Sequence, residues 1–433
     1  MGYVESKVLR VCTRSFPEVR ACVGQVEGKS IFFELYFLSY IMKGMLLIGL
    51  WAAMAAIVAL LSGMDSKVTG LSSADWIMYV GTYTRPPSRG IYCCRFDPAT
   101  GRLTRVALAA ETDDPSFLAV HPSQRFLYAA NETSTYHSES VGSISAFAID
   151  SATGRLKLLN QVSSKGAGPC HVTVDKSGKW IFTANYDGGS AAAFPIHPDG
   201  SLGEASTLVQ HKGSSVDRDR QSGPHAHSVT PAPDNRFLLV ADLGLDRVFS
   251  YPMDSATSGF ARDNPQSTAM APGSGPRHIA FTPDGRTMYV INEMLSTVTA
   301  FSYDATSARL RELQTLSTLP AGFAGPNSTA EIAVHSSGRY LYGSNRGHDS
   351  IAIFKIDQAK GSLTAAGHAS TLGHTPRSFA IDPTGQYLVA ANQESGSVVV
   401  FKIDSSTGGL TPTGTRVEIP FPVCVVFAAG SIP

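Results

Sequence analysis

The sequence predicts an all-β fold, a seven-bladed β-propeller of four-stranded antiparallel blades. One phrase occurs seven times between residues 89 and 410: an apolar strand ends in Asp or a near equivalent and Gly-x-Leu follows, as in GSISAFAIDSATGRL. A second phrase describes a hairpin, two apolar strands around a Pro/Asp/Gly turn, as in PRHIAFTPDGRTMYVINE. Together they give three strands per unit, and a fourth, less regular strand completes it. Such regularly spaced small antiparallel units are typical of a propeller.

The two ends of the repeat region predict how the ring closes. Residues 76–84 (WIMYVGTYT) match the second strand of a unit, and residues 422–427 (PVCVVF) match the first strand. Neither segment can bury its faces alone. We therefore expect the last strand to complete the blade that the first one begins, which leaves no free sheet edge at the junction. The propeller is predicted over residues 76–433.

Residues 1–75 lie outside the repeat and form a predicted N-terminal extension. Met42-Lys43 followed by an apolar run over residues 45–61 is typical of an export signal, and the run is also close to the minimum length of a membrane span. We expect a hydrophobic helix here, either a signal peptide starting at Met42 or Met45 or an uncleaved anchor. A buried core helix is the alternative. The propeller is thus expected to be exported or membrane-anchored on the periplasmic side.

The composition excludes several kinds of partner and chemistry. Lys and Arg number 35 and Asp and Glu number 35, with no basic run, so no nucleic-acid partner is predicted. The six cysteines show no Cys-x-x-Cys spacing, which favours buried free thiols. Gly-x-Ser-x-Gly, His-Glu-x-x-His and a nucleotide-binding loop are all missing from the sequence. We predict neither a covalent mechanism, nor a metal, nor a cofactor.

One polar position recurs in every complete hairpin, nine residues after the turn: Asn131, Asn185, Asp242, Asn292, Asn345 and Asn392. Because the position recurs in each blade, the fold is its best explanation. A short amide or carboxylate there can hold the following loop through hydrogen bonds to its backbone. The alternative is a ring of metal ligands, but one carboxylate among five amides is a poor cage for Ca²⁺.

The positions beside this column vary between blades and predict a site. They carry charged or imidazole side chains in some blades and Phe, Ala, Val or Leu in others. Because all blades share one geometry, a side chain that some blades lack is not required by the fold. The first strand of a blade lines the centre of a propeller, and it shares a rim with the end of the second strand. The polar members fall on consecutive units: His171, His227, Arg277, Glu293, Glu331, Arg346 and Arg377. Salt bridges along the rim are the alternative interpretation.

These residue types indicate a chemistry. Three arginines facing one space bind a carboxylate or phosphate in planar bidentate geometry. A Glu or His beside them can accept or donate a proton. The sequence therefore predicts proton-transfer chemistry on a small anionic substrate.

Several segments resemble one known family: GPHAHSV, GSGPRHIAFTPDG, INE, TAEIAVHSSGRYLYGSNRGHDSIAIFKID and TPRSFAIDPTGQYLVAANQ. They are similar to the seven-bladed β-propeller lactonase family, which includes bacterial 6-phosphogluconolactonases of the propeller type and fungal carboxy-cis,cis-muconate cyclases. The resemblance covers about residues 76–429. It implies an enzyme that acts on a lactone or its open acid without a required metal.

The resemblance also implies roles. The cyclase branch is proposed to use a His, two Arg and a Glu, and the matching positions are His227, Arg277, Glu293 and Arg346. Three further residues are then candidates for substrate binding: His171, Glu331 and Arg377.

We expect hydrolysis of a sugar lactone, with 6-phosphogluconolactone or a related aldonolactone as the small anionic partner. Two alternatives stay open: a cycloisomerase that closes carboxymuconate onto a lactone, and a non-catalytic binding propeller displayed on a membrane.

Overall fold

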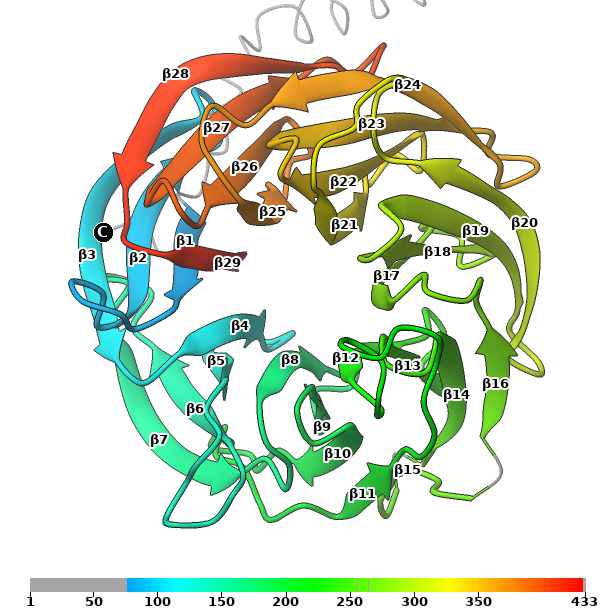
Figure 1. The fold of residues 1–433 in the computed structure, drawn as a ribbon. Helices are drawn as coiled ribbons and strands as arrows, with labels where there is room; N and C mark the ends of the chain where they lie inside the picture. Colours follow the sequence, from blue (N-terminus) through cyan, green and yellow to red (C-terminus); the bar gives the residue numbers. More distant parts are fainter. Residues whose placement is uncertain (1–75, 255, 264, 431–433) are drawn as a thin grey trace, which may run out of the picture. The chain divides into compact units, whose positions relative to one another are not determined.

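The computed structural model describes residues 76–254, 256–263 and 265–430. Its strands, β1 to β29, form seven sheets arranged as a ring (Figure 1), which confirms the predicted propeller. The expected hydrophobic helix and the rest of the N-terminal extension lie outside the described residues. Within those described ranges, no helix has the length and apolar character needed to cross a bilayer.

The first three blades are built as follows, from the innermost strand outward. Blade 1 holds β29 (Pro422–Ala429), β1 (Trp76–Thr82), β2 (Gly90–Asp97) and β3 (Arg102–Glu111). Blade 2 holds β4 (Pro115–Val120), β5 (Phe126–Asn131), β6 (Ser143–Ile149) and β7 (Leu156–Ser163). Blade 3 holds β8 (Pro169–Val174), β9 (Trp180–Asn185), β10 (Ser190–Pro195) and β11 (Thr207–Gln210).

Blade 4 departs from the four-stranded pattern. It holds β12 (Ala226–Pro231), β13 (Phe237–Asp242) and β14 (Arg247–Asp254), and its outer edge is divided between β15 (Gly259–Phe260) and β16 (Gln266–Ala269), which both pair with β14.

The last three blades return to four strands. Blade 5 holds β17 (Pro276–Phe281), β18 (Thr287–Asn292), β19 (Thr297–Asp304) and β20 (Arg309–Ser317). Blade 6 holds β21 (Ser328–Val334), β22 (Tyr340–Arg346), β23 (Ser350–Ile356) and β24 (Leu363–Ser370). Blade 7 holds β25 (Pro376–Ile381), β26 (Tyr387–Asn392), β27 (Ser397–Ile403) and β28 (Leu410–Glu418).

The ring closes within blade 1. Strand β1 pairs on one side with β2 and on the other with β29, antiparallel, from Trp76 opposite Ala429 to Thr82 opposite Pro422. Figure 1 shows β29 completing the blade that begins at the other end of the described chain. The predicted closure is therefore confirmed.

The hydrophobic core is divided among the interfaces between blades. Each of the seven junctions between consecutive blades holds its own cluster of buried side chains. The second strands lie inside these interfaces and are covered on both faces, so β5 (FLYAAN) and β18 (TMYVIN) are buried at every position. Alternation between more exposed and less exposed positions is seen in the outer strands, as in β28. A strand covered on both faces has no reason to alternate.

The repeated Asp-to-Gly phrase folds into a turn between the third and fourth strands. In blade 2, Asp150 accepts hydrogen bonds from the backbone N of Ala152 at 3.0 Å and from the Thr153 hydroxyl at 2.6 Å. Its carbonyl accepts from the N of Gly154 at 2.7 Å. Gly154 has a φ of 80°, in the left-handed region that favours glycine. The phrase is thus explained by one local hydrogen-bonded turn.

The recurrent Asn column has the structural role that the sequence predicts, but on a different loop. Four of the five Asn side chains donate through Nδ2 to a backbone carbonyl of the connection that enters their blade: Asn131 to Asp113, Asn185 to Ser164, Asn345 to Thr318 and Asn392 to Thr371. The predicted contact with the following loop is wrong for these four. Asp242 contacts both loops: its Oδ1 accepts hydrogen bonds from the backbone N of His225, in the connection that enters the blade, and of Leu245, in the loop that follows. Its Oδ2 lies 2.6 Å from His211 Nδ1.

The closing blade should be as well packed as any other interface. Phe96 of β2 is fully buried and contacts Tyr387 of blade 7 and Phe427 of β29, with ring centroids 5.8 and 5.2 Å apart. We expect Phe96→Ala to lower the free energy of unfolding by about 3–5 kcal/mol, because it leaves a cavity. Urea denaturation measures this. Phe301→Ala, equally buried between blades 4 and 5, is the matched control; a loss at Phe96 below a third of that at Phe301 would contradict a tightly sealed junction.

Candidate active site

A β-bulge at the start of each innermost strand shapes the centre of the ring. In β17, Pro276 pairs with Asn292 and His278 pairs with Ile291, so Arg277 between them has no partner in the ladder. Corresponding register shifts occur at Ser116, Cys170, His227, Arg377 and Val423, and in β21 over Ala330 and Glu331. A bulge re-aims the side chain of the extra residue. These are the variable positions that the sequence singled out.

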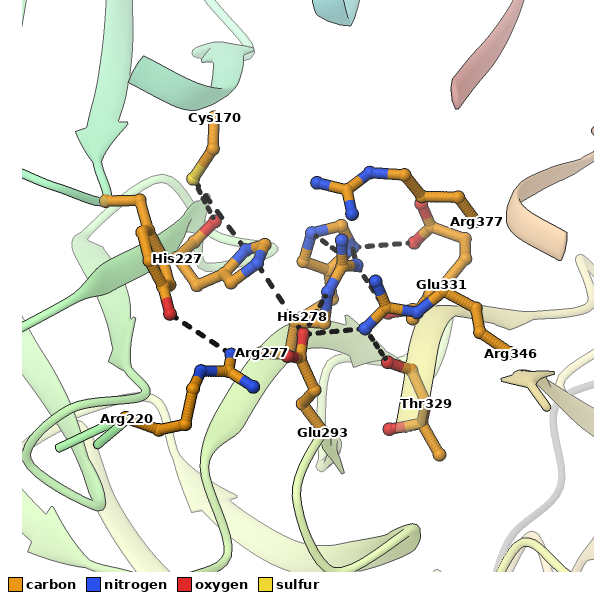
Figure 2. Close-up of polar contacts among 12 residues, drawn as sticks. Cys170, Arg220, His227, Arg277, His278, Glu293, Thr329, Glu331, Arg346 and Arg377 are labelled. Carbon is orange, nitrogen blue, oxygen red and sulfur yellow. Dashed lines mark hydrogen bonds and ion pairs between the residues drawn. The ribbon is translucent and has the colours of Figure 1, made fainter. Parts of the chain in front are cut away.

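Glu293 lies at the centre of a cluster of charged side chains, which we call the hub and which consists of Glu293, Arg220, Arg277 and Arg346 (Figure 2). Its Oε2 lies 3.0 Å from Arg277 Nε and 2.8 Å from Arg346 Nη2, and its Oε1 lies 2.7 Å from Arg220 Nη2. His227 Nε2 is 3.9 Å from the same Oε2. The structure therefore brings His227, Arg277, Glu293 and Arg346 together, from blades 4, 5 and 6.

The ionisation of this hub follows from burial and its neighbours. Burial alone would raise the pKa of Glu293, but the charges of Arg346 and Arg277 outweigh it and lower the pKa to about 2. Burial lowers the pKa of Arg346 to about 10, against the pull of Glu293, and it also lowers the pKa of Arg277. All of these groups are charged near neutral pH.

Three imidazoles line the space beside the hub. The His171 ring stacks on Phe117 with centroids 4.1 Å apart, and the His278 ring meets the rings of His171 and His227 edge-on at 5.2 and 5.4 Å. Burial lowers the pKa of His171, His227 and His278 well below 6.5. These three side chains are neutral imidazoles near pH 7 and can exchange hydrogen bonds in either direction.

Glu331 lies apart from the hub and in a different state. Its Oε1 is 3.0 Å from His278 Nδ1 and also accepts a hydrogen bond of 3.0 Å from the backbone N of Ile332. Burial raises the pKa of Glu331 to about 7, although the charge of Arg277 opposes the rise. Glu293 and Glu331 thus differ in protonation behaviour.

Arg377 lies beyond the hydrogen-bonded cluster. Its guanidinium lies over the ring of Tyr83, 5.3 Å from the centroid, and its Nη2 is 4.0 Å from Glu132 Oε2. The Tyr83 hydroxyl donates to that carboxylate at 3.1 Å. Burial lowers the pKa of Arg377, but the neighbouring Tyr83 and Glu132 more than compensate and raise it. Of the seven predicted residues, Arg377 and His171 are the two that form neither a hydrogen bond nor an ion pair with Glu293, its arginine partners or Glu331 among the described residues, although both lie close enough to Glu331 to act on its charge.

Arg220 is a member of the hub that the sequence comparison missed. It comes from residues 211–225, the longest connection between two described blades, and its Nη2 also donates to the Tyr186 hydroxyl at 3.1 Å. The connection is anchored by Gln221, whose Nε2 donates to the carbonyl of Leu243, and by Ser215, whose hydroxyl donates to Asp246. No sister blade has a loop to compare with it. Its length and its Asp-Arg-Asp-Arg run were the available signals.

His278 was visible in the sequence beside Arg277 but was not chosen. Its importance comes from the bulge, which lets two successive residues of β17 reach the centre.

Among the described residues no three His, Cys, Asp or Glu side chains are close enough together to hold a metal ion. Cys170, whose Sγ lies 3.8 Å from His227 Nδ1, has a pKa raised by burial, so it is a thiol and not a thiolate.

The model of the protein family "Lactonase, 7-bladed beta-propeller" matches residues 77–427. The chain belongs to the seven-bladed β-propeller lactonase family. The 6-phosphogluconolactonase of Bacillus subtilis is 37% identical over 355 residues, which cover 81% of this chain and 98% of that protein.

Two solved structures extend the comparison with the lactonase family. One from Bacteroides fragilis is 38% identical with a TM-score of 0.77 and covers 84% of this chain and 100% of its own. The periplasmic gluconolactonase of Pseudomonas aeruginosa is 34% identical with a TM-score of 0.77 and covers 82% of this chain and 99% of its own.

The hub should contribute to stability as well as to chemistry. We expect Glu293→Gln to lower the free energy of unfolding at pH 7 by about 3–5 kcal/mol, since it leaves buried guanidiniums without their carboxylate. The folded-state pKa of Glu293 is lowered to about 2, so its stabilisation is fully present above the unfolded value of about 4.3 and is lost as the pH falls toward 2.

Urea denaturation at pH 7, 5 and 3 measures the difference between the wild type and Glu293→Gln. This difference in the free energy of unfolding should be constant from pH 7 to 5 and smaller at pH 3. Glu418→Gln, which breaks an exposed pair with Arg416 of 2.9 Å, is the control and should cost less than about 1 kcal/mol. Equal losses in the two variants would contradict the hub.

Proposed function

We propose that this lactonase-family propeller hydrolyses a sugar lactone at the centre of its ring. The observation that carries the proposal is the charge balance of the hub, where Arg220, Arg277 and Arg346 share the single carboxylate of Glu293. Three positive charges against one negative charge leave an excess of two positive charges in a largely buried site. Such a site favours an anionic substrate and the negative charge that develops on a carbonyl oxygen under attack.

The arginines have donors to spare for this task. Arg346 Nε is buried and has no hydrogen-bond partner among the described residues. Arg277 is fixed by its bond to Glu293 and by a bond of 2.7 Å from Nη1 to the carbonyl of Ala330. Donors held in place before the reaction stabilise an oxyanion without reorganisation. We assign oxyanion stabilisation to Arg277 and Arg346, and to Glu293 the task of holding them.

The remaining predicted residues have roles around the substrate. The neutral His227 imidazole lies beside the hub and can orient the attacking water. Arg377 forms no hydrogen bond with another described residue and can bind a phosphate or carboxylate on the far side of the substrate. His171, stacked on Phe117, offers an apolar edge for the sugar ring.

The identity of the lactone is proposed from the relatives. The Bacillus subtilis protein is named for 6-phosphogluconolactone and the Pseudomonas aeruginosa protein for gluconolactone. We propose 6-phosphogluconolactone, or a related aldonolactone, as the substrate, because the excess positive charge of the hub favours an anion.

Removal of an oxyanion donor gives the direct test. We expect Arg277→Ala to lower kcat for 6-phosphogluconolactone about 10²–10³-fold. Arg377→Ala should act mainly by raising KM, because its proposed contact is with the anionic group of bound substrate. Rates are measured by the release of acid, after subtraction of spontaneous hydrolysis.

Arg346→Lys keeps the charge and serves if Arg277→Ala fails to fold. Arg286→Ala, at an exposed arginine, is the control. Wild-type rates in Arg277→Ala and Arg346→Lys on every lactone would overturn the proposal. Turnover of carboxymuconate in place of any lactone would instead favour the cycloisomerase.

We propose that the propeller is exported, or anchored to a membrane by residues 45–61. The apolar run and its preceding Lys43 support this, as does the periplasmic relative. Cell fractionation and mass spectrometry of the mature N-terminus provide the test. We expect the protein in the periplasmic or membrane fraction; a cytosolic protein that retains residues 1–61 would overturn export.

A further inference from the structure

Glu331 presents one free carboxylate oxygen to the centre of the ring. Its Oε1 is occupied by His278 Nδ1 and the backbone N of Ile332. Its Oε2 has no hydrogen bond to another described residue and is not one of the buried unpaired atoms, and the side chain is 14% exposed. Oε2 is therefore accessible to a molecule bound in the site. Figure 2 shows the carboxylate pointing toward the His278 ring.

Glu293 is the opposite case. Its Oε1 accepts from Arg220, and its Oε2 accepts from Arg277 and Arg346. Both oxygens are committed to guanidiniums, which cannot give up their protons. A proton on either oxygen would weaken the attraction to these guanidiniums, so Glu293 is poorly suited to act as a base.

His278 fixes which oxygen of Glu331 can receive a proton. Arg277 Nη1 lies 3.1 Å from His278 Nε2 and 3.4 Å from Nδ1, so its contact with the imidazole does not by itself select the accepting nitrogen. The ionised Glu331 carboxylate can only accept a hydrogen bond, so the neutral imidazole carries its proton on Nδ1 and donates it to Glu331 Oε1. With Oε1 already accepting two hydrogen bonds, a further proton binds at Oε2. His278 is a positioning residue for Glu331.

We propose that Glu331 Oε2 is the proton acceptor in lactone hydrolysis, a step that rests on the proposed function. The water oxygen forms a bond to the lactone carbonyl carbon, its proton passes to Oε2, and the carbonyl electron pair moves onto oxygen as the oxyanion. When the ring C–O bond breaks, the electron pair of the oxyanion re-forms the carbonyl. The proton on Oε2 passes to the departing alkoxide, so the carboxylate is restored and the product is the hydroxy acid.

The surroundings of Glu331 fit this role. The groups that face it are Arg277 and His278 from β17, Arg377 from β25, His171 from β8 and Cys424 from β29. The imidazoles and the thiol are neutral near pH 7, and the two arginines can steady the carboxylate between proton transfers. A pKa of about 7 is well matched to a general base at neutral pH.

The pH dependence separates Glu331 from the other candidates. A base must be deprotonated, so kcat/KM should fall about tenfold for each pH unit below 7 and level off above it. His227 remains neutral and Glu293 remains ionised across this range, so neither would produce a limb near pH 7.

The experiment compares the wild type, Glu331→Gln and Glu331→Asp from pH 5 to 8.5, with spontaneous hydrolysis subtracted at each pH. Glu331→Gln should lose about 10²–10⁴-fold in kcat at pH 8, and the limb near pH 7 should disappear. KM and the calorimetric affinity for 6-phosphogluconate should stay within about twofold, which a substrate-binding role would not allow. Glu331→Asp should restore part of the rate together with a titrating limb.

Glu394→Gln, at an exposed carboxylate in the turn after β26, is the matched control and should behave as the wild type. An active wild type whose limb near pH 7 persists unchanged in Glu331→Gln would overturn this inference and leave the lactonase proposal standing. A folded wild type without activity on any lactone would overturn the proposed function itself.

Discussion

The arrangement at the centre of the ring depends on one carboxylate shared by three guanidiniums. Glu293 follows directly after the second strand of blade 5, and its partners come from the first strand of the same blade, from the end of β22 in blade 6 and from the connection before blade 4. Without a shared anion, buried like charges at this distance would repel one another. The carboxylate therefore determines where the arginines can lie, and the excess positive charge that remains is what an anionic substrate can use.

The fold tolerates such a cluster because the hydrophobic burial that stabilises the propeller lies in other parts of the molecule. Seven apolar clusters between blades, sealed in blade 1 by the pairing of β1 with β29, carry the hydrophobic burial. The bulge at the start of each innermost strand then frees one residue per blade from the ladder. That residue can be Ser, Cys, His, Arg or Val without loss of backbone pairing.

The sequence predicted the fold well because each blade can be compared with the others. The blade count, the closing strand and the structural Asn column all follow from differences and likenesses among repeats. The same comparison selected Glu293 and Arg277, because the corresponding positions of other blades hold apolar residues such as Leu243 and Ala330. It could not select Arg220, which lies in a connection without a counterpart, and it could not assign the loop that Asn131 holds, because both adjoining loops are polar. The full burial of strands such as β5 also depends on neighbouring blades that a single repeat does not reveal.

The two glutamates show what residue type alone cannot predict. Both follow from the same column argument, and both lie at the rim near Arg277. Glu293 is surrounded by guanidiniums on both oxygens, which lowers its pKa to about 2, whereas Glu331 has one oxygen fixed by an imidazole and a backbone N and the other left free, and burial raises its pKa to about 7. Environments that push two carboxyl pKa values apart assign them different tasks. One glutamate is suited to hold positive charge in place, and the other to exchange a proton with a bound molecule.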